Sequence, residues 1–279
     1  MFKSEVIRPH KSLFRLQLGE VWNYRDLLLM FVKRDFVAGF KQTILGPLWF
    51  FIQPVFTTLM FTLVFGKIAG ISTDGQPKML FYLSGLTIWN YFADTFNKTS
   101  TVFITNAAVF GKVYFPRLIA PLSIIVAGLL RFAVQMILFI GFYAYYMITL
   151  PGSLHPTWAL FLVPFLILLM AGFALGFGII ISALTTKYRD MIQLIAFGVT
   201  LLMYATPVIY PMNSIPGKYQ VYIALNPLSP IVETFRYAFL GSGMISWSSL
   251  TYSFVFMLVA VITGTLIFNK VERTFMDTV

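Results

Sequence analysis

The sequence contains no cysteine, only two histidines and few charged residues. Without cysteine the chain has no disulfide, no thiolate nucleophile and no cysteine-ligated metal. Charged residues make up 11% of its 279 residues, against about 25% in soluble domains, which argues against a soluble globular enzyme. The chain has no phosphate-binding G-x-x-x-x-G-K-[ST] loop, and its 10 acidic residues are scattered without a D-x-D motif. We therefore expect neither catalysis nor P-loop ATP binding from this chain.

Apolar residues are abundant instead. Hydrophobic residues make up 58% of the chain and aromatic residues 18%, and the mean hydropathy is +0.82. Such a composition is typical of a chain that crosses a membrane. Residues 1–26 contain no apolar stretch like that of a signal peptide, so we expect the N-terminus to stay in the cytoplasm.

Runs of about 20 residues with little or no charge mark the expected membrane-spanning helices. A Pro- and Gly-containing turn at 151–156 and a short charged break at 187–190 divide the longest apolar stretch. We predict an all-α membrane protein with six transmembrane helices, at about 43–66, 79–98, 118–148, 158–184, 191–210 and 249–269. They leave a cytoplasmic N-terminal segment at 1–42, an inner loop at 99–117, an outer segment at 211–248 and a cytoplasmic tail at 270–279.

The distribution of basic residues supports this topology. With the N-terminus inside, fifteen of the 20 Lys and Arg residues fall in inner segments and four in outer segments, and Arg131 lies within a span. An excess of basic residues on the cytoplasmic side is the usual orientation signal of membrane proteins. The net charge of +10 therefore reflects topology rather than nucleic-acid binding, and both termini are expected in the cytoplasm.

Two segments do not read as simple spans. Residues 18–40 predict an N-terminal amphipathic interfacial helix, whose apolar face holds Leu18, Val21, Trp22, Leu28, Leu29, Val32 and Phe36. The outer segment 211–248 is apolar but interrupted by Pro and Gly residues, which predicts short re-entrant helices before the last span.

Two charged residues fall within the predicted spans, and such residues are functional candidates by default. At about 1.5 Å of rise per residue, Asp94 and Arg131 are expected at depths that differ by about 12 Å. A direct ion pair then needs a long arginine reach or a shifted helix boundary. The alternative is that each charge faces water or extends toward the membrane surface.

Four groups of residues, taken together, are similar to one family. They are Arg34-Asp35 with residues 41–49 and Gln53-Pro54; Asn106 with residues 112–117 and Pro121; residues 188–190; and residues 206–211 with Asn226-Pro227 and Arg236. In this order, in a six-span chain without an ATP site, they resemble the permease of type-2 ABC exporters that move lipid-linked polysaccharides. The resemblance covers nearly the whole length.

The resemblance implies a homodimer of permeases bound to two copies of a separate ABC ATPase in the bacterial inner membrane. The substrate it implies is a polyprenyl-pyrophosphate-linked polysaccharide of the O-antigen type. No cofactor is expected in this chain, since ATP and magnesium would bind the partner subunit. A teichoic acid or capsular polysaccharide exporter is the alternative within the family, and a proton-coupled lipid flippase is the alternative outside it.

The resemblance also implies roles for residues at the two membrane surfaces. The inner loop would dock on the ATPase through Val109, Phe110, Lys112, Val113, Tyr114, Phe115, Pro116 and Arg117. Arg189 and Asp190 would add a second contact, unless they form a latch to Arg34-Asp35 or a structural salt bridge. The outer gate would contain Asn226, Pro227, Glu233 and Arg236.

The substrate path is expected to be aromatic and amide-rich, because sugar rings stack on aromatic faces and their hydroxyls form hydrogen bonds. The candidates are Trp49, Phe50, Phe51, Gln53, Trp89, Asn90, Tyr91, Tyr204 and Tyr210, which otherwise are membrane-surface anchors or core residues. Either the substrate pyrophosphate or lipid head groups would bind Arg25, Lys33, Arg34 and Lys41. Gly172, Gly176 and Gly178 would allow close helix packing, at a dimer seam or within the chain.

Overall fold

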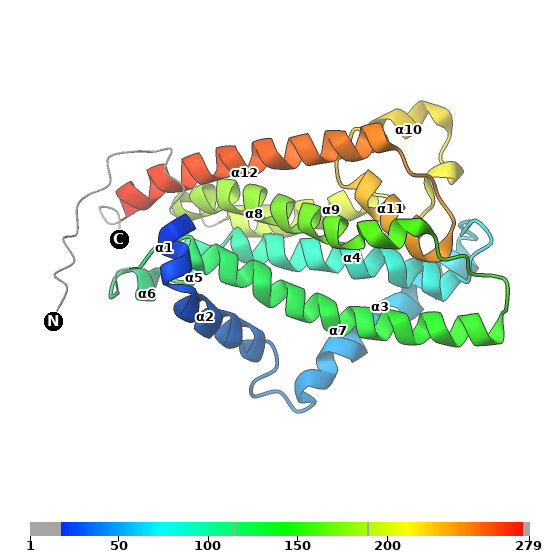
Figure 1. Ribbon diagram of the computed structural model, residues 1–279, viewed down its shortest axis with the longest axis horizontal. Helices are drawn as coiled ribbons and strands as arrows, with labels where there is room; N and C mark the ends of the chain where they lie inside the picture. Colours follow the sequence, from blue (N-terminus) through cyan, green and yellow to red (C-terminus); the bar gives the residue numbers. More distant parts are fainter. Residues whose placement is uncertain (1–17, 114, 189, 276–279) are drawn as a thin grey trace.

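Figure 1 shows the computed structural model, which describes residues 18–113, 115–188 and 190–275. All regular structure in these residues is helical. The longest helices run side by side along the molecule and are α4 (Lys78–Thr99), α7 (Ile119–Thr149), α8 (Val163–Lys187) and α12 (Trp247–Phe275). The N-terminal helices are α1 (Leu18–Asn23), α2 (Arg25–Ala38), η1 (Gly46–Leu48), α3 (Trp49–Phe61) and the π-helical η2 (Thr62–Ile68).

The remaining helices are short. Two of them, α5 (Val102–Thr105) and α6 (Ala107–Phe110), connect α4 to α7. The others are η3 (Trp158–Leu162), α9 (Met191–Tyr204), η4 (Met212–Ser214), α10 (Gly217–Ala224) and α11 (Ser229–Leu240). The predicted outer segment is thus helical in pieces, and α11 is buried against α4 and α8 whereas α10 has no buried residue.

Four helical segments are long and apolar enough to cross a membrane: Gly46–Ile68, Ile119–Thr149, Trp158–Lys187 and Trp247–Lys270. They correspond to four of the six predicted spans. Of the other two, α9 has 14 residues, a length of about 21 Å that is short of a 30 Å hydrocarbon core. The second, α4, has 22 residues but carries Asp94 and Lys98. Because α3, α7, α8 and α11 surround α4, its surface need not be apolar throughout.

The two ends of the described chain lie at the same end of the bundle. In Figure 1, α1 and the end of α12 lie together with α5 and α6, whereas α10 and the turn between α7 and η3 lie at the opposite end. Because both ends of the described chain lie at one end of the bundle, the fold is consistent with an even number of membrane crossings.

Small residues bring α8 into direct contact with α12 and α4. A Cβ atom added at Gly176 would lie 2.7 Å from the backbone carbon of Ala260, and one at Gly172 would collide with the sulfur of Met257. A Cβ atom at Gly178 would lie 2.6 Å from Thr99 of α4. For these three glycines the sequence left two alternatives, a dimer seam or a contact within the chain. The structure places all three in contacts within the chain.

The N-terminal amphipathic segment is two helices rather than one. The backbone breaks at Tyr24, and α2 packs against α7 through Phe31 and Val32. Trp22 and Leu29, which the predicted apolar face included, are 70% and 59% exposed. These two side chains are therefore not covered by the rest of the chain, and an apolar face that meets the membrane interface stays a prediction.

Candidate functional site

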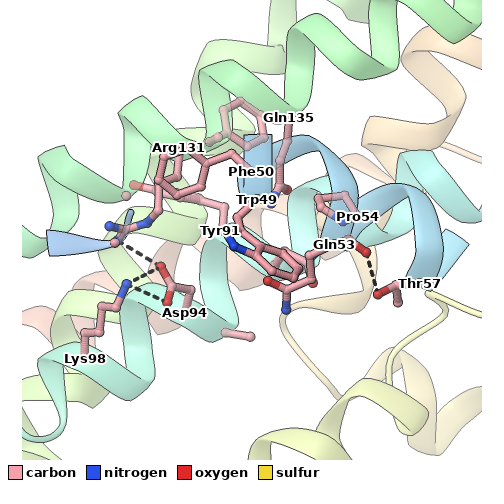
Figure 2. A pocket seen from close by; sticks show the side chains of 15 residues that line it. Trp49, Phe50, Gln53, Pro54, Thr57, Tyr91, Asp94, Lys98, Arg131 and Gln135 are labelled. Carbon is pink, nitrogen blue, oxygen red and sulfur yellow. Dashed lines mark hydrogen bonds and ion pairs between the residues drawn. The ribbon is translucent and has the colours of Figure 1, made fainter. Parts of the chain in front are cut away.

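A cavity of about 340 Å³ lies between α3, α4 and α7 (Figure 2). Aromatic rings, amides and charges share its wall. They belong to Trp49, Phe50, Tyr91 and Phe132, to Gln53, Asn90 and Gln135, and to Asp94, Lys98 and Arg131. Pockets of this size with a few convergent polar groups are typical of ligand sites.

The α3 wall of the cavity depends on a proline inside the helix. Pro54 has no amide hydrogen, so the carbonyl of Phe50 loses its helical donor. Trp49, Gln53 and Thr57 recur at one-turn spacing on the same face, and the Thr57 hydroxyl donates to the carbonyl of Gln53 at 2.9 Å. The Phe50 ring stacks on Phe36 of α2 at 5.3 Å, which ties the start of α3 to the end of α2.

The opposite wall is formed where α4 and α7 approach closely. A Cβ atom added at Gly128 would lie 2.5 Å from Thr95 Oγ1, so a larger residue here would have to displace the Thr95 side chain. One turn along, Arg131 Nη2 lies 2.8 Å from Asp94 Oδ2, and Lys98 Nζ lies 2.8 Å from Asp94 Oδ1. Figure 2 shows this three-residue ion cluster beside Tyr91 and Trp49.

The ion pair contradicts the expected 12 Å difference in depth between Asp94 and Arg131. Asp94 lies five residues before the end of α4 at Thr99, and Arg131 lies twelve residues after the start of α7 at Ile119. The expected difference assumed that the inner ends of α4 and α7 lie at the same depth in the membrane. Because α7 begins well beyond the end of α4, with α5 and α6 between them in the chain, the two residues come to the same height.

A second cavity, of about 420 Å³, adjoins the first and shares Lys98 and Arg131 with it. Its wall includes Arg34, Asp35 and Asn106. Arg34 donates to Asp35 Oδ1 at 2.8 Å and to Asn106 Oδ1 at 3.0 Å. The Ser123 hydroxyl of α7 donates to Asp35 Oδ2 at 3.2 Å. The Arg34-Asp35 motif thus joins α2 to the inner loop and to α7.

Four basic residues were expected to bind pyrophosphate or lipid head groups, and the structure separates them. Arg34 lines the second cavity. Arg25 lies 5.7 Å from the Trp22 ring, and Lys33 and Lys41 are exposed.

Five of the nine expected channel residues line the first cavity: Trp49, Phe50, Gln53, Asn90 and Tyr91. The structure places the other four elsewhere. Phe51 lines an apolar depression against the far half of α7, and Trp89 is buried in the main core. Tyr204 is half exposed, and its carbonyl accepts a 2.7 Å hydrogen bond from the hydroxyl of Tyr210.

The inner loop also divides into buried and exposed residues. Phe110 and Phe115 pack in the chain's own core beside Phe31, so their rings are not free to fill a groove in an ATPase. Pro116 is buried too, and Val109 and Arg117 are half-buried. Lys112, Val113 and Asp190 are exposed, whereas Tyr114 and Arg189 lie outside the described residues. The predicted role of Phe110 and Phe115 is therefore corrected to internal packing.

The four expected outer-gate residues form one cluster. The Asn226 amide donates to Thr206 Oγ1 at 2.8 Å, and the Pro227 carbonyl accepts from Ser253 of α12 at 2.7 Å. The buried Arg236 side chain lies 3.0 Å from Glu233 Oε1 and donates to the carbonyls at 207 and 208. The structure thus brings the 206–211 motif, Asn226-Pro227 and Arg236 together.

Gln135 and Lys98 are among the residues of the first cavity that the sequence did not single out. Gln135 lies one turn after Arg131 on α7, and Lys98 lies one turn after Asp94 on α4. Spacing of three or four residues puts side chains on the same helix face, so this signal was present. Among the described residues, no group of three or more His, Asp or Glu side chains gathers to hold a metal ion.

Comparison with known proteins places the chain among transporter permeases. A model of the ABC-2 type transporter family matches residues 26–240. The O-antigen export system permease protein RfbA of Klebsiella pneumoniae is 27% identical over 252 residues, covering 90% of this chain and 94% of the relative. RfbA of Myxococcus xanthus is 27% identical over 222 residues, covering 79% and 82% of the two chains. The polysialic acid transport protein KpsM of Escherichia coli is 24% identical over 251 residues, covering 86% and 91%.

The family match spans α2 to α11 and therefore includes both cavities and the outer cluster. Such permeases work with an ABC ATPase partner, which supplies the nucleotide chemistry that this chain lacks. The chain belongs to the ABC-2 type transporter family, as a multi-pass membrane permease that is not itself an ATPase.

Proposed function

We propose that this chain is the channel-forming subunit of an exporter that moves a polyprenyl-pyrophosphate-linked polysaccharide of the O-antigen type out of the cytoplasm. The observation that carries the proposal is the cavity between α3, α4 and α7, where aromatic rings and amides adjoin cations. Rings and amides suit sugars, and cations suit phosphate. The similarity to O-antigen export permeases over 90% of the chain supports the same substrate class.

The proposed membrane arrangement has six crossings, with both termini in the cytoplasm of a bacterium. The four long apolar segments provide four crossings, and α4 and α9 provide the other two within the bundle. The shared position of α1 and the end of α12 in Figure 1 supports this arrangement, as does the excess of basic residues in the predicted inner segments.

The assembly we propose is a homodimer bound to two ATPase subunits, with ATP and magnesium on the ATPases. Exposed apolar faces on α3 and α9 offer surface for lipid or for a second permease; they include Phe56, Leu59, Met60, Leu194, Phe197 and Leu201. On the inner side, Lys112 and Val113 project from the loop between α6 and α7 and are the exposed residues of the expected docking segment. The buried Phe110 and Phe115 would hold that segment in place.

The similarity to KpsM makes capsular polysaccharide export the second candidate. A proton-coupled flippase has less support, because Asp94, the one carboxylate within the predicted spans, is ion-paired through both oxygens with Lys98 and Arg131.

The proposal is tested by deleting the gene in its host. We expect lipid-linked glycan to accumulate inside the cell while surface O-antigen is lost, and a plasmid copy to restore both. Retained O-antigen with loss of a capsule would favour the second candidate. Export by the purified chain alone, driven by a proton gradient without ATP, would overturn the proposed function.

A further inference from the structure

Arg131 is a buried cation with unused hydrogen-bonding capacity. The residue is 9% exposed, and its Nη2 atom lies 2.8 Å from Asp94 Oδ2. Among the described residues, however, none of its three guanidinium nitrogens forms an aligned hydrogen bond. A guanidinium carries five N–H donors, and leaving buried donors unmatched costs free energy.

Among the described residues, Arg236 is a second buried arginine, and it is bonded more fully: both of its Nη atoms have partners, although its Nε has none. Arg236 donates to Glu233 and to two backbone carbonyls, and its Cζ lies 3.9 Å from the centre of the Phe81 ring. It lines neither of the cavities beside Asp94, whereas Arg131 lines both. Arg131 therefore forms part of both cavity walls, with its three guanidinium nitrogens covered just beneath the lining surface.

The charge balance at this junction favours an anion. Three cations and two carboxylates line the two cavities, which leaves one positive charge in excess; they are Arg34, Lys98 and Arg131, and Asp35 and Asp94. One carboxylate, that of Asp94, is shared between two cations. Arg34 is already bonded to Asp35 and Asn106, so Lys98 and Arg131 carry the excess.

The groups beside this charge suit a sugar. Trp49 and Gln53 of α3 lie next to each other in the same cavity. The ion cluster lies opposite them, on α4 and α7 (Figure 2). A flat aromatic ring and an amide can hold the apolar face and the hydroxyls of one sugar ring. An anionic group and a sugar joined to each other would fill both parts of the lining.

We propose that Arg131 and Lys98 bind the pyrophosphate of the lipid-linked polysaccharide, with Trp49 and Gln53 contacting the first sugar. The inference rests on the proposed function and places the pyrophosphate at a buried site rather than on Arg25, Lys33 and Lys41. The planar guanidinium fork of Arg131 matches two phosphate oxygens, and Lys98 supplies a more mobile point charge. Neither residue was assigned this role by the sequence.

The test measures binding of polyprenyl pyrophosphate to the full chain in lipid nanodiscs. We expect Arg131→Gln to weaken binding roughly ten- to hundredfold, the effect of a charge-assisted hydrogen bond. Lys98→Gln should weaken it less, because this side chain is half exposed and screened. Arg131→Lys should fall between the wild type and Arg131→Gln. Lys218→Gln, an exposed charge change on α10, should bind like the wild type.

Three competitors identify the ligand chemistry. Inorganic pyrophosphate, phosphatidylglycerol and polyprenyl monophosphate should each compete weakly with polyprenyl pyrophosphate. Equal competition by inorganic pyrophosphate or by phosphatidylglycerol would overturn a site for the lipid-linked group. Wild-type affinity in both Arg131→Gln and Lys98→Gln would overturn the assignment of these residues. If Arg131→Gln fails to fold, wild-type affinity in both Arg131→Lys and Lys98→Gln would overturn it instead.

A parallel export assay separates the two claims. If the wild-type chain with its ATPase exports lipid-linked glycan while both variants bind and export normally, the inference fails and the proposed function stands. If the wild-type complex binds no polyprenyl pyrophosphate and exports no lipid-linked glycan, both fail.

Discussion

The Cζ atom of Arg236 on α11 lies 3.9 Å from the centre of the Phe81 ring on α4. The same guanidinium donates to the carbonyl oxygens of Pro207 and Val208 at 2.9 and 3.1 Å and to Glu233 at 3.0 Å. One side chain therefore fastens the segment after α9 to α4 and α11. A Cβ atom added at Gly85 would lie 2.8 Å from the Val208 carbonyl, so glycine at this position lets that segment reach α4.

Replacing Arg236 is expected to destabilise the protein strongly. Arg236→Met leaves the buried Glu233 carboxylate unpaired, which should lower the free energy of unfolding by about 3–5 kcal/mol. The double variant Glu233→Gln/Arg236→Met removes both charges and should recover part of this loss. Equilibrium unfolding of the purified variants in mixed micelles measures both values. Equal stability of Arg236→Met and wild type would show that the cluster does not hold the outer segment.

The contact between α8 and α12 is expected to depend on glycine. Gly176→Ala places a Cβ atom 2.7 Å from the backbone of Ala260, which cannot move aside as a side chain could. We expect a loss of about 1–3 kcal/mol, as for other overpacked sites, measured by the same unfolding experiment. Gly198→Ala in α9 is the matched control, because no atom lies within 4 Å of its added Cβ. That variant should gain stability slightly through helix propensity.

Removing the Asp94 carboxylate charge should loosen the α4–α7 contact. Asp94→Asn leaves Arg131 and Lys98 facing each other without a counter-ion, so the melting temperature should fall. Asp26→Asn, at an exposed carboxylate on α2, is the control and should melt like wild type. An unchanged melting temperature in Asp94→Asn would show that solvent already screens the two cations.

Docking on the ATPase is expected to depend on the exposed residues of the inner loop. Val113→Asp should reduce recovery of the permease–ATPase complex roughly tenfold, because it puts a charge into an apolar contact. Phe115→Ala should instead lower the stability of the permease itself, since the Phe115 ring packs against Phe31. Val221→Asp, equally exposed on α10, is the control. Complex recovery unaffected by Val113→Asp would place the docking surface elsewhere.

Hydropathy predicted the long helices because apolar length is a local property. The spans expected at 118–148 and 158–184 agree closely with α7 and with the segment Trp158–Lys187. Depth was harder to predict, because the relative heights of α4 and α7 depend on the connection at 100–118. For that reason the ion pair between Asp94 and Arg131 did not follow from counting residues.

Burial within the loop could not be predicted either. Phe110 and Phe115 are apolar loop residues of the kind expected on a docking surface. Both instead fill a core with Phe103 of the same loop and with Phe31 and Phe268 from distant parts of the chain. The neighbouring residues Phe50 and Phe51 of α3 differ in the same way. Phe50 lines the cavity and Phe51 does not, because they point to different sides of the helix.

Trp49 and Phe51 lie on different sides of α3, and replacing each of them tests the proposed substrate path. Trp49→Ala removes the ring beside the ion cluster and should lower export of lipid-linked glycan severalfold, by the loss of one stacking contact of about 1 kcal/mol. Phe51→Ala removes an aromatic ring from an apolar depression two residues along and should leave export near wild type. Glycan export per ATP hydrolysed, measured in proteoliposomes that contain the ATPase, compares the two. Equal losses would mean that α3 contributes by packing rather than by contacting sugar.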